Sequence, residues 1–154
     1  MLIKFFCLLL LLTASAFAKQ ETLKKLTTDY CTSYPEGTPK KPDLWKHCCL
    51  IHDMTFWAGG ISSERMQADL DLRSCIEETG ARDQAKLIYF AVRIASYSPI
   101  KYPSKKWNNG WKNRMSYQEL SPADIDQVEA ELQGGYPFIE PSIKEHFIHM
   151  LRTR

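Results

Sequence analysis

The sequence predicts an exported, mainly helical domain in which two long helices are joined by disulfide bonds. Three observations support this fold class: an apolar segment at the N-terminus, four cysteines after it, and helix-like segments bounded by glycine and proline. The chain has 154 residues, a length that suits one domain after removal of a leader.

The first 18 residues have the pattern of a signal peptide. Lys4 precedes an unbroken apolar run from Phe5 to Leu12, and Ala16-Phe17-Ala18 supplies small residues for cleavage. The run is short for a bilayer span and no second one follows, so we expect no transmembrane segment. The expected organisation is a signal peptide over residues 1–18 and one domain over 19–154, in a secreted or periplasmic protein.

Glycine, proline and capping residues divide the rest of the chain into expected helices. A short amphipathic helix is expected over Lys19–Asp29, followed by a loop to Lys41. Further helices are expected from about Pro42 to Trp57, 62 to 79, 81 to 97, 121 to 134, and from Ser142 to the C-terminus. Strand patterns are scarce, with at most a small hairpin near Asn109.

The four cysteines that follow the leader are expected to form disulfides. They are Cys31, Cys48, Cys49 and Cys75, an even number in an exported small domain. Four cysteines allow three pairings, and the residues alone do not select one.

The charge balance excludes one class of partner. The formal net charge is only +2, with basic and acidic residues in near balance, so the chain lacks the basic excess of a nucleic-acid-binding protein. We expect a monomer.

The chemistry is concentrated on the helix around His52. At helical spacing, His52 shares a broad face with Cys48 and Cys49, and this face is expected to look onto the helix that carries Asp69 and Asp71. A histidine backed by a carboxylate is a general-base arrangement. Helical geometry leaves Asp69 and Asp71 as alternative partners.

A hard-metal site is expected beside the histidine. Asp53 can offer carboxylate oxygens, and carbonyls of the loop from Tyr30 to Thr38, with Tyr30, Thr32 and Gly37 as the expected ligands, can complete an oxygen shell of the kind that calcium prefers. The expected cofactor is therefore Ca²⁺, which would stabilise the oxyanion formed when water attacks an ester.

The run Cys48-Cys49-Leu50-Ile51-His52-Asp53 resembles the Cys-Cys-x-x-His-Asp active-site helix of secreted phospholipase A2 enzymes. The spacing from Asp69 to Cys75 is similar to the spacing between the family's catalytic aspartate and a disulfide cysteine. The resemblance covers about residues 30–75. It implies two long antiparallel helices, His52 and Asp69 as catalytic residues, and the pairings Cys31–Cys49 and Cys48–Cys75.

The chain departs from the family pattern at several positions. Thr55 and Ala68 stand where the family has both cysteines of a further bridge, so the two halves are lost together. Phe56 replaces a tyrosine, and the loop at residues 30–38 has one glycine where the family has several.

Two other interpretations of the histidines and cysteines remain open. A zinc site is conceivable from His47, His52 and cysteines 31, 48 and 49, although neighbouring cysteines on a helix point in different directions. His146 and His149, at i and i+3, suit solvent or core positions and signal metal binding only weakly.

The region from Lys101 to Tyr117 mixes aromatic and basic residues. One interpretation is a surface that binds a phospholipid membrane through Trp107, Trp111, Lys105 and Lys106. The alternative is that the tryptophans close the core beneath a turn.

Two functions follow from these patterns. The first is a calcium-dependent phospholipase A2-like hydrolase that cleaves a fatty-acyl ester of glycerophospholipids by His-activated water. The second is a non-catalytic lipid- or protein-binding protein on the same scaffold.

Overall fold

The computed structural model describes residues 21–97, 106–114 and 117–154, and confirms the mainly helical class. The helices are α1 (Lys46–Ala58), α2 (Ser62–Glu78), α3 (Arg82–Tyr97), α4 (Pro122–Gly134) and α5 (Pro141–Arg152). Within these described ranges, β structure is limited to isolated bridges. The predicted signal peptide lies outside them. None of the described helices is both long and apolar enough to span a membrane.

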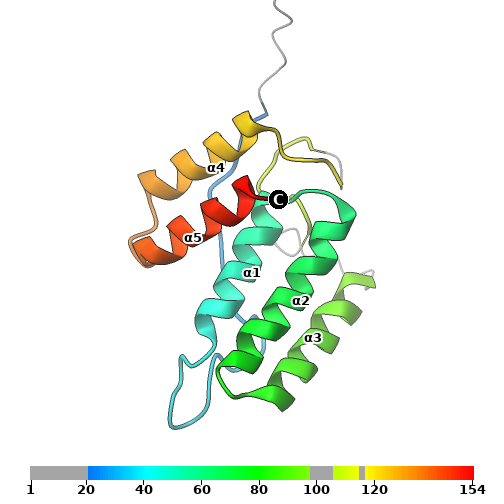
Figure 1. Ribbon diagram of the computed structural model, residues 1–154, viewed down its shortest axis with the longest axis vertical. Helices are drawn as coiled ribbons and strands as arrows, with labels where there is room; N and C mark the ends of the chain where they lie inside the picture. Colours follow the sequence, from blue (N-terminus) through cyan, green and yellow to red (C-terminus); the bar gives the residue numbers. More distant parts are fainter. Residues whose placement is uncertain (1–20, 98–105, 115–116) are drawn as a thin grey trace, which may run out of the picture.

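Helix α1 lies between two helical layers, α2 with α3 on one side and α4 with α5 on the other (Figure 1). Its residues Leu50, Met54 and Trp57 belong to a core shared with α4 and α5, whereas Cys48 and Cys49 belong to a core shared with α2 and α3. Both sides of α1 are therefore buried, and the buried area fixes its position between the layers.

Two glycines make the turn between α1 and α2. Gly59 has φ 79° and Gly60 has φ 138°, values that favour glycine. Asn108 binds this turn, because its Oδ1 accepts a hydrogen bond from the Gly60 amide at 3.0 Å. A Cβ on Gly59 would lie 1.5 Å from the same oxygen, so the turn has no room for a larger residue.

Both disulfide pairings that the resemblance implied are confirmed. Cys48 of α1 is bonded to Cys75 of α2, with their Cα atoms 5.7 Å apart. Cys31 in the preceding loop is bonded to Cys49, with a Cα separation of 5.1 Å. The first bond ties α1 to α2, and the second ties the loop to α1.

The helix predicted over Lys19–Asp29 is wrong for the part that the structure describes, residues 21–29, which is not helical. Instead, Leu23 forms an antiparallel bridge with Trp111, and the Lys24 amide donates to the Gly110 carbonyl at 2.6 Å. The Lys24 carbonyl accepts from the indole of Trp57 at 2.8 Å. Tertiary partners satisfy this backbone, so its weak helical pattern is overridden.

Several predicted helix starts shift by a few residues. Helix α1 begins at Lys46 rather than near Pro42, because the preceding residues form turns in which the Trp45 amide donates to the Glu36 carbonyl. Helix α5 begins at Pro141, one residue before the expected cap at Ser142. Proline at the first helical position explains that start.

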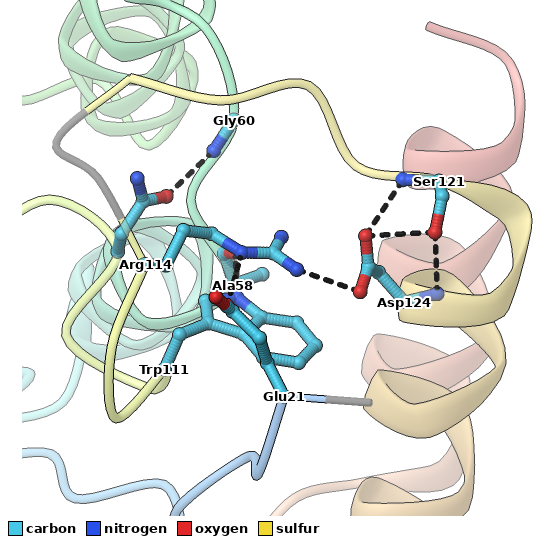
Figure 2. Close-up of polar contacts among 8 residues, drawn as sticks. Glu21, Ala58, Gly60, Trp111, Arg114, Ser121 and Asp124 are labelled. Atoms are coloured by element: carbon cyan, nitrogen blue, oxygen red, sulfur yellow. Dashed lines mark hydrogen bonds and ion pairs between the residues drawn. The ribbon is translucent and has the colours of Figure 1, made fainter. Parts of the chain in front are cut away.

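The cap of α4 is formed as its sequence suggests, and a buried arginine extends it into a network (Figure 2). Ser121 Oγ accepts from the Asp124 amide at 3.2 Å. The Asp124 carboxylate in turn accepts from Arg114, whose side chain is only 2% exposed. Arg114 also donates to Glu21 and stacks 3.8 Å from the Trp111 ring. This network joins the N-terminal segment to the start of α4.

Candidate active site

His52 and Asp69 meet between α1 and α2. The imidazole Nε2 lies 2.8 Å from Asp69 Oδ1, and the Asp69 side chain is fully buried while that of His52 is 11% exposed. An ionised carboxylate accepts the Nε2 proton, so Nδ1 is the nitrogen that can accept a proton. Within the described chain, Nδ1 has no hydrogen-bond partner.

The geometry selects Asp69 over Asp71. Asp71 is exposed on α2 and accepts a hydrogen bond from Gln67 at 2.7 Å. The Cys48–Cys75 bond sets the register, because it lies four residues before His52 on α1 and six after Asp69 on α2. Two helices that run in opposite directions from the Gly59–Gly60 turn bring these positions to the same level.

Arg93 on α3 is the site residue that the sequence analysis did not identify. Its Nη1 lies 2.8 Å from Asp69 Oδ2, the oxygen that His52 does not use. Burial alone would raise the pKa of Asp69, but the hydrogen bonds from His52 and Arg93 outweigh it and hold the pKa below its ordinary value. The sequence does contain a signal that could have identified Arg93: it is the one charged residue in the otherwise apolar run from Phe90 to Ala95.

Aromatic side chains cover one side of the imidazole. The ring of Phe56 lies 4.5 Å from that of His52, and Trp107 meets Phe56 edge-on at 5.1 Å. The guanidinium of Arg65 lies 5.7 Å from the Phe56 ring centroid. Phe56 therefore packs directly against the histidine.

Asp53 faces the loop before α1 rather than α2. Its Oδ2 accepts a hydrogen bond from Thr28 Oγ1 at 2.7 Å, and the same hydroxyl accepts from the Tyr30 amide at 2.9 Å. Tyr30 and Thr32 have φ values of 54° and 60°, in the left-handed region that favours glycine. Such strained backbone often occurs at functional sites. Here it occurs at two of the expected calcium ligands.

Gly37, the third expected loop ligand, lies elsewhere. A Cβ on Gly37 would be 2.0 Å from the Lys41 carbonyl and 2.6 Å from the Leu44 amide. Gly37 therefore packs against the residues that directly precede α1. Asp53 is two turns further along α1, roughly 10 Å at the helical rise. One ion at 2.3–2.6 Å from each ligand cannot contact both residues. Of the expected ligands, Asp53 and Tyr30 are joined through the Thr28 hydroxyl, whereas Gly37 packs against Lys41 and Leu44.

The geometry does not favour zinc. His47 Nε2 lies 3.4 Å from Cys48 Sγ and 3.6 Å from Cys75 Sγ, but these sulfurs are bonded to each other. A zinc site requires thiolates, which a disulfide does not supply. His146 and His149 are both exposed on α5.

The residues predicted to bind a membrane lie in different environments in the structure. Trp107 and Trp111 are 7% and 3% exposed, and their indoles donate to the carbonyls of Gly60 and Ala58. The tryptophans therefore close the core, as in the alternative interpretation. Lys106 is exposed, and Lys105 lies outside the described residues.

Comparisons with protein-family models, with curated proteins and with solved structures gave no match.

Proposed function

We propose that this chain is an exported calcium-dependent hydrolase of the phospholipase A2 type, which cleaves a fatty-acyl ester of glycerophospholipids. The observation that carries the proposal is the buried Asp69 carboxylate on His52 Nε2, which leaves Nδ1 to act as a base. The two disulfides and the paired α1 and α2 helices support the same family type.

In the proposed reaction, His52 Nδ1 accepts a proton from a water molecule as the water oxygen attacks the ester carbonyl carbon. Asp69 holds the ring orientation and stabilises the imidazolium that forms. The carbon–oxygen bond to the glycerol then breaks, and the imidazolium returns its proton to the departing alkoxide oxygen. The products are a free fatty acid and a lysophospholipid.

Asp53 and the backbone around Tyr30 and Thr32 are the proposed calcium ligands. A calcium ion held by these residues would supply positive charge to stabilise an oxyanion on the ester carbonyl. The Thr28 hydroxyl orients the Asp53 carboxylate through its 2.7 Å hydrogen bond.

The direct test is an assay of fatty-acid release from mixed phospholipid vesicles by the purified protein. We expect release that stops with a calcium chelator, returns with added calcium, and is lost in His52→Gln. Exposed His149→Gln is the matched control and should keep full activity. Full activity in His52→Gln, or no release by the wild type with calcium present, contradicts the proposal.

The second candidate is a non-catalytic lipid- or protein-binding protein on the same scaffold. The single glycine in the loop at residues 30–38 and the phenylalanine at position 56 favour it, because both depart from the active-site pattern of the family. Vesicle binding without turnover that is unchanged in His52→Gln would support this function, and clear turnover would exclude it.

A further inference from the structure

Arg65 differs from the other partly or fully buried arginines of this site and its surroundings. Arg93 pairs with Asp69, Arg73 with Glu77, and Arg114 with Asp124. Arg65 is half-buried on α2, yet no carboxylate of the described chain lies within 4.0 Å of its nitrogens. A half-buried guanidinium without a counter-charge favours an anionic ligand, so this position needs an explanation.

The hydrogen bonds of Arg65 are incomplete as well. Its Nη1 donates to the hydroxyl of Tyr117 at 2.6 Å, but its Nε is buried and has no acceptor in the part of the chain that the structure describes. The face of Phe56 attracts the cation without supplying an acceptor for that N–H. An oxyanion that accepts from the outer Nη groups would supply the missing counter-charge.

The position of Arg65 links it to the reaction centre. It lies four residues before Asp69 on α2, so the two side chains occupy the same face one turn apart. Its guanidinium is 5.7 Å from the Phe56 ring, and that ring is 4.5 Å from His52, so the guanidinium lies within about 10 Å of the imidazole. Tyr117 is 45% exposed, so the Arg65–Tyr117 pair lies at the surface beside the site.

A glycerophospholipid presents a phosphate at a matching position. Only a few covalent bonds separate its phosphorus from the ester carbonyl on the neighbouring glycerol carbon. A cation beside the base can therefore hold the phosphate while the carbonyl lies at His52. The planar guanidinium suits phosphate, because two of its N–H groups can bind two oxygens of the same group.

We infer that Arg65, together with the Tyr117 hydroxyl, binds the phosphate group of the lipid substrate beside His52 and Asp69. The inference rests on the proposed hydrolase function. Nη1 remains bonded to the Tyr117 oxygen, Nη2 donates to the phosphate, and the Tyr117 hydroxyl donates its own proton to a second phosphate oxygen. Arg65 thus selects esters that carry a phosphate over neutral esters.

The kinetic test compares a short-chain phosphatidylcholine with the diacylglycerol of the same acyl chains, which has the same esters and no phosphate. We expect Arg65→Gln to raise KM for the phospholipid roughly tenfold, and to change kcat/KM for the diacylglycerol by less than about twofold. Arg65→Lys should recover part of the loss, and Tyr117→Phe should show a smaller loss. Arg73→Gln, on the same helix, should behave as the wild type. Equal losses on both substrates, or no loss on the phospholipid, would overturn the inference.

A binding test separates failure of this inference from failure of the proposed function. The non-hydrolysable dialkyl-ether analogue of the phosphatidylcholine is titrated into ¹⁵N-labelled protein while the arginine Nε–H signals are recorded. We expect the Arg65 signal, assigned by its loss in Arg65→Gln, to shift whether or not the protein hydrolyses esters. No shift overturns the inference. Inorganic phosphate is the second arm: a shift at lower concentrations of phosphate than of the ether lipid would assign the site to free phosphate and overturn the lipid assignment.

Discussion

Arg93 of α3 donates to Asp69 Oδ2 at 2.8 Å while His52 of α1 occupies Oδ1 at the same distance. The fully buried carboxylate is thus shared by two helices that lie on different sides of α2 (Figure 1). The arginine thus reaches the carboxylate from a different helix than the histidine does. Asp69 is therefore both the orienting group of the proposed base and the polar link among α1, α2 and α3.

Replacing Arg93 should destabilise the fold and reduce turnover. In Arg93→Gln, Asp69 stays buried without its guanidinium, and we expect the free energy of unfolding to fall by about 2 kcal/mol. Arg93→Lys keeps the charge and should lose less. Urea unfolding measures the change in all variants. Arg73→Gln, which removes a more exposed pair with Glu77, is the control and should lose under about 1 kcal/mol. Equal losses in Arg93→Gln and Arg73→Gln would refute the role of the buried pair.

Asp69 should make stability depend on pH below neutrality. Because its pKa is lowered in the folded protein, the folded state binds fewer protons than the unfolded chain between the two pKa values. The stabilisation is complete above the ordinary aspartate pKa of about 3.9 and is lost as the pH falls through the lower folded value. The free energy of unfolding of the wild type should therefore decrease on acidification, and Asp69→Asn should show a smaller decrease.

Chemical unfolding between pH 2 and pH 7 measures this difference. The dependence in Asp69→Asn should not vanish, because Arg114 and Ser121 also hold the pKa of Asp124 below its ordinary value against the effect of burial. Exposed Asp71→Asn should keep the wild-type dependence. If Asp69→Asn and the wild type lose stability in parallel, Asp69 does not contribute as described.

Removing either disulfide should lower the free energy of unfolding by a similar amount. The two removals should differ in their effect on kcat and on the calcium concentration needed for activity. The bonds close loops with sequence separations of 27 and 18 residues, so each double cysteine-to-alanine variant should lose about 3 kcal/mol. Loss of Cys48–Cys75 loosens α2 from α1 and should lower kcat. Loss of Cys31–Cys49 frees the loop that approaches Asp53 and should raise the calcium concentration needed for activity. Thermal unfolding and calcium titrations of activity measure the two effects, and unchanged kcat in the Cys48/Cys75 variant would contradict the first.

The network around Arg114 should be structural. Its side chain is 2% exposed, and Arg114→Met would leave Asp124 and Glu21 without their partner (Figure 2). We expect a loss of about 2 to 3 kcal/mol in urea unfolding. Arg152→Met removes a pair of ion contacts at a side chain that is 42% exposed, and should lose clearly less stability than Arg114→Met. A loss in Arg114→Met no larger than that in Arg152→Met would show that the network contributes little.

The local pattern of the sequence determined most of the helices and the candidate site. Glycine and proline mark helix ends because they have few or unusual backbone conformations, and this information is local. The i to i+4 spacing places Cys48 and His52 on one face by helical geometry alone. The motif around His52 therefore indicated the candidate base, although the disulfide pairing and the choice between Asp69 and Asp71 needed the family resemblance or the coordinates.

Tertiary structure decided the features that depend on partners far away in the chain. The segment at 21–29 is not helical because Gly110, Trp57 and Tyr136 satisfy its backbone. Arg93 reaches Asp69 only because α3 packs on α2, and Gly37 packs against Lys41 and Leu44 in the turns before α1. Local sequence encodes backbone preference and periodicity. Which charge meets which carboxylate, and which carbonyl lies near which aspartate, depends on how the helices pack.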